Sequence, residues 1–174
     1  MPYVFDLDTL AQRARDLAAG FGAAQPYPHV VIDEFLRADA ARELARVFPG
    51  PDDAVAWDHY AAPGLEVKLG CGREERLPAP IRQAIHDLNS GPFIRFLEQL
   101  TGIEHLLPDP HLSGGGIHLS RHGGHLGVHA DRRNSGIRHE WRQIHLDNGV
   151  EMSVWLQVDR RRANRVIPFS GATA

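Results

Sequence analysis

Apolar positions in the first hundred residues follow the spacing of helices. They recur every three or four residues, as on one side of an amphipathic helix, in four segments: 8–19, 39–48, 80–88 and 92–100. Gly20 directly follows the first of these segments, and Gly102 lies two residues after the end of the last one. Glycine commonly ends a helix at such positions. The pattern therefore predicts four helices, the first ended by Gly20 and the last by Gly102.

From residue 103 onward the helical spacing disappears, and glycine and histidine become frequent. A glycine-containing turn at 121–124 predicts a hairpin between the segments on either side of it. The segments 57–60 and 66–69 fit either short strands or parts of a long loop. Runs of β-branched and other apolar residues predict strands at 29–33, 103–107, 117–120, 126–131, 151–158 and, more weakly, 166–169.

Helices first and strands later predict an α+β fold, in which the helices pack on one side of an antiparallel sheet or barrel. The length of 174 residues suits a single domain. We expect one domain over 1–174, with a helix-rich part at 1–102 and a strand-rich part at 103–174.

Composition places the chain among ordinary soluble proteins, with 43% hydrophobic and 24% charged residues. No apolar run approaches the roughly 20 residues that span a bilayer, and the first residues lack the pattern of a secretory signal. We therefore expect a cytoplasmic protein with no membrane partner. The single cysteine, Cys71, is expected to be a small buried residue and not a nucleophile.

The charge is uneven along the chain. Residues 132–174 hold eight arginines and four acids, a local balance of +4, whereas the whole chain carries −3. Basic segments can bind nucleic acid, but these arginines come with acids and without a stacking motif. We therefore expect no nucleic-acid partner.

The triplet His129-Ala130-Asp131 is the main candidate for chemistry. On a strand, residues two apart point to the same side, so His129 and Asp131 could hold one metal ion together. With a second histidine they would form the facial triad of non-haem Fe(II) oxygenases. The triplet alone is a weak signal, because a surface strand often carries such residues by chance.

A longer series of motifs surrounds this triplet. It comprises LTGI at 100–103, LPDPHL at 107–112, GGGIH at 114–118, GGHL at 123–126 and HAD at 129–131, preceded by PYPHVVIDEFL at 26–36 and EVKL at 66–69. In this order, the motifs resemble the Fe(II)/2-oxoglutarate-dependent dioxygenases of the prolyl 4-hydroxylase-like superfamily, in particular a bacterial branch. The resemblance covers about residues 25–131.

The resemblance implies a double-stranded β-helix, or jelly-roll, carrying N-terminal helices. It implies that His129 and Asp131 are two of the three iron ligands, with Fe(II) as cofactor and 2-oxoglutarate and O2 as cosubstrates. The implied reaction couples oxidative decarboxylation of 2-oxoglutarate to hydroxylation of a C–H bond in a small-molecule or peptide substrate.

The chain departs from this family after Asp131. The family has a distal histidine and then a basic residue that pairs with 2-oxoglutarate, but the only later histidines are His139 and His145, in no family-like motif. They are either the third ligand or solvated turn residues around 140–142. The arginines at 160–162 and 165 are either carboxylate-binding or a solvated loop. Leu126 stands where many members have a tyrosine.

These departures predict a jelly-roll that is incomplete at its C-terminus through divergence, truncation or a change of reading frame. Two functions remain open. One is an Fe(II)/2-oxoglutarate-dependent hydroxylase with a complete site, and the other is a non-catalytic or truncated domain of the same fold that acts as a binding or interaction module.

Overall fold

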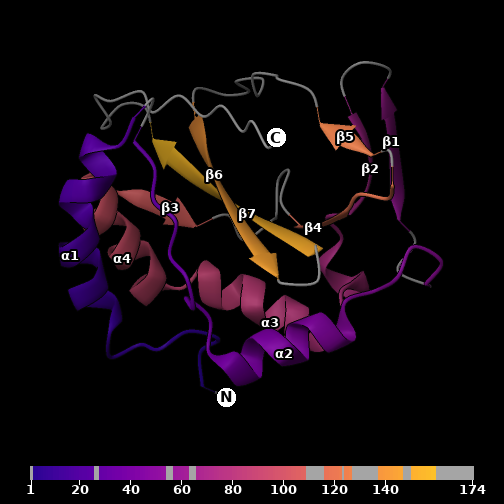
Figure 1. Ribbon diagram of the computed structural model, residues 1–174, viewed down its shortest axis with the longest axis horizontal. Helices are drawn as coiled ribbons and strands as arrows, with labels where there is room; N and C mark the ends of the chain where they lie inside the picture. Colours follow the sequence, from indigo (N-terminus) through magenta and orange to yellow (C-terminus); the bar gives the residue numbers. More distant parts are fainter. Residues whose placement is uncertain are drawn as a thin grey trace.

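The computed structural model describes residues 2–25, 28–53, 57–62, 66–108, 116–122, 124–126, 137–146 and 150–159. Within these ranges the chain forms four α-helices, one short 3-10 helix and seven strands, so the predicted α+β class is confirmed. The helices precede residue 102 and gather along one side of the strands, with α1 and α4 at the end of the sheet formed by β3 (Figure 1).

The first helix, α1, is longer than the sequence predicts. It spans Leu10–Ala23 and passes through Gly20, so the prediction that Gly20 ends it is wrong. Thr9 is its N-cap residue, although the Thr9 side chain makes no capping hydrogen bond. Leu17 and Phe21 both pack against the core. Their burial offsets the roughly 1 kcal/mol that glycine costs inside a helix.

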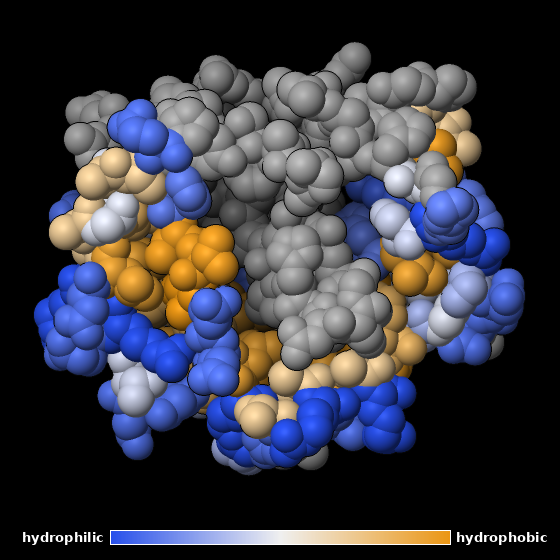
Figure 2. Space-filling view, in the orientation of Figure 1, coloured by the Kyte–Doolittle hydropathy of each residue, from blue (hydrophilic) through white to orange (hydrophobic). Residues whose placement is uncertain are grey.

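The second helix, α2 (Ala38–Val47), buries Leu44 and turns its polar side outward. Its outer surface, along the lower edge of Figure 2, is mostly hydrophilic. Asp39 lies in the first turn and pairs with Arg37, and this hydrogen bond holds the pKa of the Asp39 carboxyl below its usual value. The helix begins and ends within one residue of the predicted range 39–48.

Helices α3 (Ala79–Leu88) and α4 (Gly91–Thr101) also confirm their predictions. Gly102 follows α4 with φ +68°, a left-handed conformation that favours glycine. Both helices contribute to a single apolar core, which includes buried residues of α1, α2 and the sheet. Their buried apolar residues are Ile81, Ala84, Ile85, Leu88, Phe93, Ile94, Phe96, Leu97 and Leu100.

The N-terminal segment is tied to the helices instead of to a strand at 29–33. The predicted strand at 29–33 is wrong. In residues 28–37, all of which the structure describes, the β-pairing consists of one isolated bridge between Phe5 and Leu36. Val31 is 79% exposed, so its β-branched side chain has no core to fill. Phe5 instead stacks on Phe93 with ring centroids 5.5 Å apart.

All strand pairs are antiparallel. The sheet order is β1-β2-β4-β7-β3, with β5 also on β2 and β6 also on β7. The strand bounds are β1 Asp58–Ala62, β2 Glu66–Cys71, β3 Leu106–Pro108, β4 Gly116–Leu119, β5 His125–Leu126, β6 Ile137–Leu146 and β7 Val150–Asp159. The two ambiguous segments near 57–60 and 66–69 are therefore strands.

The predicted hairpin across 121–124 is wrong. β4 and β5 do not pair with each other, because both run antiparallel to β2 along the same edge. They are two parts of one strand, interrupted by a short excursion in which Gly124 donates a hydrogen bond to the Arg121 carbonyl at 2.7 Å. A Cβ on Gly124 would lie 2.9 Å from the Val67 carbonyl oxygen, so glycine lets the chain return to β2.

His139 and His145 lie on β6, which pairs along its whole length with β7. The interpretation of residues 140–142 as a solvated turn is therefore wrong. The strand predicted at 151–158 is confirmed as β7. The segment at 166–169 and the arginines at 160–162 and 165 lie outside the described residues. None of the helices in the described ranges combines the length and apolar character needed to cross a bilayer.

Removal of the Asp87 carboxylate should loosen the N-terminal segment. Asp87 is 5% exposed and accepts hydrogen bonds from the Val4 backbone N–H at 2.9 Å and from the Gln83 side chain at 2.8 Å. Asp87→Ala leaves the Val4 N–H unsatisfied, so we expect a loss of about 1.5–3 kcal/mol in urea unfolding. The exposed Asp8→Ala serves as control, and an equal loss in both variants would contradict this role.

Two glycine substitutions should have opposite effects on stability. Gly116 has φ +139°, and a Cβ there would lie 2.3 Å from the Cys71 carbonyl oxygen. Gly116→Ala should therefore lower the free energy of unfolding by about 3 kcal/mol. Gly20 has nothing within 4 Å of its Cβ position and lies inside α1, so Gly20→Ala should raise it by about 0.5–1 kcal/mol. Equal signs in urea titrations would refute the comparison.

Candidate functional site

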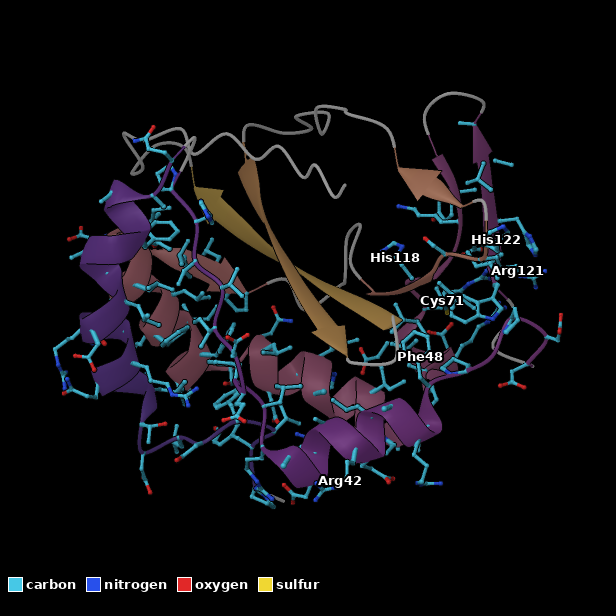
Figure 3. All side chains as sticks on the ribbon, in the orientation of Figure 1. Arg42, Phe48, Cys71, His118, Arg121 and His122 are labelled. Carbon is cyan, nitrogen blue, oxygen red and sulfur yellow. The ribbon has the colours of Figure 1, made fainter. Side chains whose placement is uncertain are left out.

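The central strands β2 and β4 have two chemically different faces. Cys71 and Ile117 belong to the core that the helices share and are 1% and 0% exposed. Lys68, Gly70 and His118 alternate onto the other face. Figure 3 shows His118 and Cys71 on opposite sides of this part of the sheet. The face away from the helices is therefore the polar one, and the expectation of a buried Cys71 is confirmed.

Gly70 makes room on the polar face for two rings. A Cβ on Gly70 would lie 2.9 Å from Cε2 of Tyr60 and 3.3 Å from Nδ1 of His118. Tyr60 comes from β1 and His118 from β4, so the two rings reach over β2 from opposite edges. The absent side chain at position 70 is what lets both rings lie close to the backbone of β2.

The His118 imidazole is enclosed although it lies on the polar face. The residue as a whole is half-buried, yet each of its ring nitrogens exposes less than 1 Å² to solvent. An imidazole is the commonest metal-binding side chain in proteins and is also a common proton carrier. His118 is therefore the described histidine that is best shielded from water on this face.

Lys68 is the only lysine in the chain and lies next to Tyr60. Its Nζ is 5.3 Å from the centroid of the Tyr60 ring, within the range of a cation–π contact. Asp58 on β1 is paired with Gly70 on β2 and forms an ion pair with Arg73. This corner of the sheet thus holds two cations, one carboxylate and one imidazole.

Gly70 and His118 are directly paired, and the strand register continues this row of paired positions across the sheet. His118 pairs with Glu151 on β7, and Glu151 pairs with His145 on β6. Directly paired positions share a face, so positions 118, 151 and 145 stand side by side on one face. Position 139 pairs with 157, which is six residues from 151, and lies on the same face farther along β6.

The main predicted ligands, His129 and Asp131, lie outside the described residues. The last described residue before them is Leu126, which pairs with Glu66 at the start of β2. His129 follows Leu126 by three positions and Asp131 by five. Their role as a metal-binding pair therefore stays a prediction.

The structure separates the other histidines of this region. His125 pairs with Val67, an odd number of positions from Gly70, so position 125 lies on the face opposite to position 118. His122 is exposed in the excursion between β4 and β5. The two neighbouring strand histidines are therefore not brought together.

Among the residues whose side chains are described, no group of three or more histidine, cysteine, aspartate and glutamate side chains is arranged to hold a metal ion. The side chains at positions 145 and 151 are not among those described. Comparisons with protein-family models, with curated proteins and with solved structures find no match to this chain.

Sequence reasoning missed the grouping of Tyr60, Lys68 and His118. The signal lay in the alternation of polar and apolar residues at 66–71, where Val67, Leu69 and Cys71 share one face. That alternation predicts a half-buried strand. It does not name the partners of that strand, and the partners are what bring His118 beside Gly70.

A side chain at position 70 should disturb both rings at once. Gly70→Ala places a methyl group against Tyr60 and His118, and we expect a loss of about 1 kcal/mol in the free energy of unfolding. The atom nearest to the new methyl group belongs to Tyr60. The double variant Gly70→Ala with Tyr60→Ser should therefore lose less free energy of unfolding than the two single variants lose together. Additive losses would show that the rings do not meet at Gly70.

Proposed function

We propose that the chain is a non-haem Fe(II) and 2-oxoglutarate-dependent dioxygenase that hydroxylates a C–H bond. His129 and Asp131 are two iron ligands in this proposal. The observation that carries it is the ordered series of motifs, which begins near residue 25 and ends at Asp131. We further propose that it acts in the cytoplasm on a small molecule or a peptide.

The distribution of polar and apolar residues over the sheet supports this proposal. Helices cover one face, where Cys71 and Ile117 are buried, and the other face carries His118 and the positions of His139, His145 and Glu151. Imidazole nitrogens and carboxylate oxygens are the donors that non-haem Fe(II) takes. We propose that this sheet is one wall of a double-stranded β-helix with its chemistry on the polar side.

The glycines of the motif series have structural roles that agree with the proposal. Gly116 and Gly124 allow β4 and β5 to follow β2 closely, because a Cβ at either position would meet backbone oxygen within 3 Å. The chain then leaves β5 at Leu126, three residues before His129. This part of the motif series thus sets the path of the chain as far as the end of β5.

The third ligand is proposed to be His139 or His145. Both positions share a face with His118, but they are six residues apart on β6. At about 3.3 Å per residue this is a separation of roughly 20 Å, so a single ion can take only one of them.

The protein's part in the proposed reaction is to bind and to orient. The iron with 2-oxoglutarate and O2 supplies the oxidising power when bound. His129 and Asp131 are proposed to hold the metal from one side and leave its other positions for the cosubstrate and O2. A site shielded from water, as the His118 ring nitrogens are, limits side reactions.

Anaerobic addition of Fe(II) and 2-oxoglutarate should produce a visible metal-to-ligand charge-transfer band. His129→Ala should abolish this band, because it removes an imidazole that holds the ion. His122→Ala is the matched control, since His122 is exposed in the excursion after β4, and it should keep the band. Circular dichroism of each variant confirms that it is folded.

Absence of the band in folded wild-type protein would contradict the active enzyme. The binding or interaction module would then be the better description of the domain. A band that survives His129→Ala would instead show that other residues hold the iron.

A further inference from the structure

We propose that His118, Glu151 and His145 form a binding site for a divalent transition-metal ion across β4, β7 and β6. The juxtaposition that carries the proposal is a single row of directly paired positions, 118 with 151 and 151 with 145. The site uses neither His129 nor Asp131, and it assigns His145 to a metal ion other than the proposed iron, so it goes beyond the proposed dioxygenase function.

Strand register gives these positions a suitable spacing. Directly opposed residues in an antiparallel pair have Cβ atoms about 4.5–5.5 Å apart and share a face. Position 151 lies on the middle strand, and the two histidine positions flank it on the outer strands. An ion above the middle strand would be about one strand spacing from each outer backbone, a distance that an imidazole can bridge.

The chemistry of the three residue types suits a borderline divalent ion. Two imidazoles and one carboxylate are a ligand set used for zinc and for non-haem iron. Harder ions such as Mg²⁺ and Ca²⁺ prefer sites made wholly of oxygen donors. The row therefore favours Zn²⁺, Co²⁺ or Fe²⁺ over Mg²⁺.

The surroundings of His118 are consistent with a ligand role. Its ring nitrogens are shielded from solvent, and its Nδ1 lies 3.3 Å from the Cβ position of Gly70. With Nδ1 against β2, Nε2 is the nitrogen assigned to the metal. At the far end of the same row, the carboxylate of Asp58 is bound by Arg73 and does not compete for the ion.

Assignment of His145 to this row has a consequence for the proposed iron site. His139 is then the remaining histidine after Asp131 that could serve there as the third ligand. The two sites draw on different residues, so they can be separated by mutation.

Titration with Co²⁺ tests the row in the full chain that carries His129→Ala. This background removes a ligand of the proposed iron site and leaves the row intact. We expect one equivalent of Co²⁺ to bind, with visible ligand-field bands, and Zn²⁺ to displace it. Adding His118→Ala, Glu151→Gln or His145→Ala should weaken binding at least about 100-fold, because residues that only orient a ligand already contribute roughly 10–100-fold.

Glu140→Gln is the matched control on the same pair of strands. Position 140 pairs with 156, an odd number of residues from 151, so it lies on the opposite face. This variant should bind Co²⁺ as the His129→Ala background does. Thermal unfolding without metal checks that each variant is folded.

Two results would overturn the metal site. One is Co²⁺ affinity that is unchanged by Glu151→Gln in folded protein. The other is loss of all Co²⁺ binding on His129→Ala alone, which would place the ion at the proposed iron site instead. Conversely, Co²⁺ binding by the row without any 2-oxoglutarate band in the wild type would support this site and contradict the dioxygenase.

Discussion

The pairing of β2 on both of its edges is the constraint on which the rest of the sheet depends. β1 occupies one edge, and β4 and β5 share the other. Because neighbours on both sides follow its alternation, β2 determines which residues of three other strands face the helices. A slip of one residue would exchange Cys71 and Gly70 between the core and the polar face.

Burial on the helix side fixes this register. Cys71 and Ile117 are paired positions that both lie in the core, so a slip would expose one and bury polar neighbours without partners. The energy that selects the register therefore comes from the apolar face. The arrangement of Gly70 and His118 on the other face follows from that selection, although these residues contribute little apolar burial of their own.

The sequence predicts three of the four helices well, because apolar residues recur at helical spacing in each of them. It fails at Gly20, where the burial of Phe21 outweighs the glycine. It also fails at 29–33, where a β-branched run has no partner strand among the described residues. Strand existence is local information, whereas strand pairing is not. For this reason β2 was foreseeable as a strand and its link to β5 was not.

The same distinction governs the candidate site. Eight of the eleven histidines lie between His105 and His145, but their density alone does not tell which of them share a site. Register instead divides them, with positions 118 and 145 on one face and position 125 on the other. Ligand sets on a sheet are defined across strands, at spacings near 5 Å, and not along the chain. A histidine-rich segment therefore indicates that metal chemistry is available, and the pairing of strands decides which histidines can share an ion.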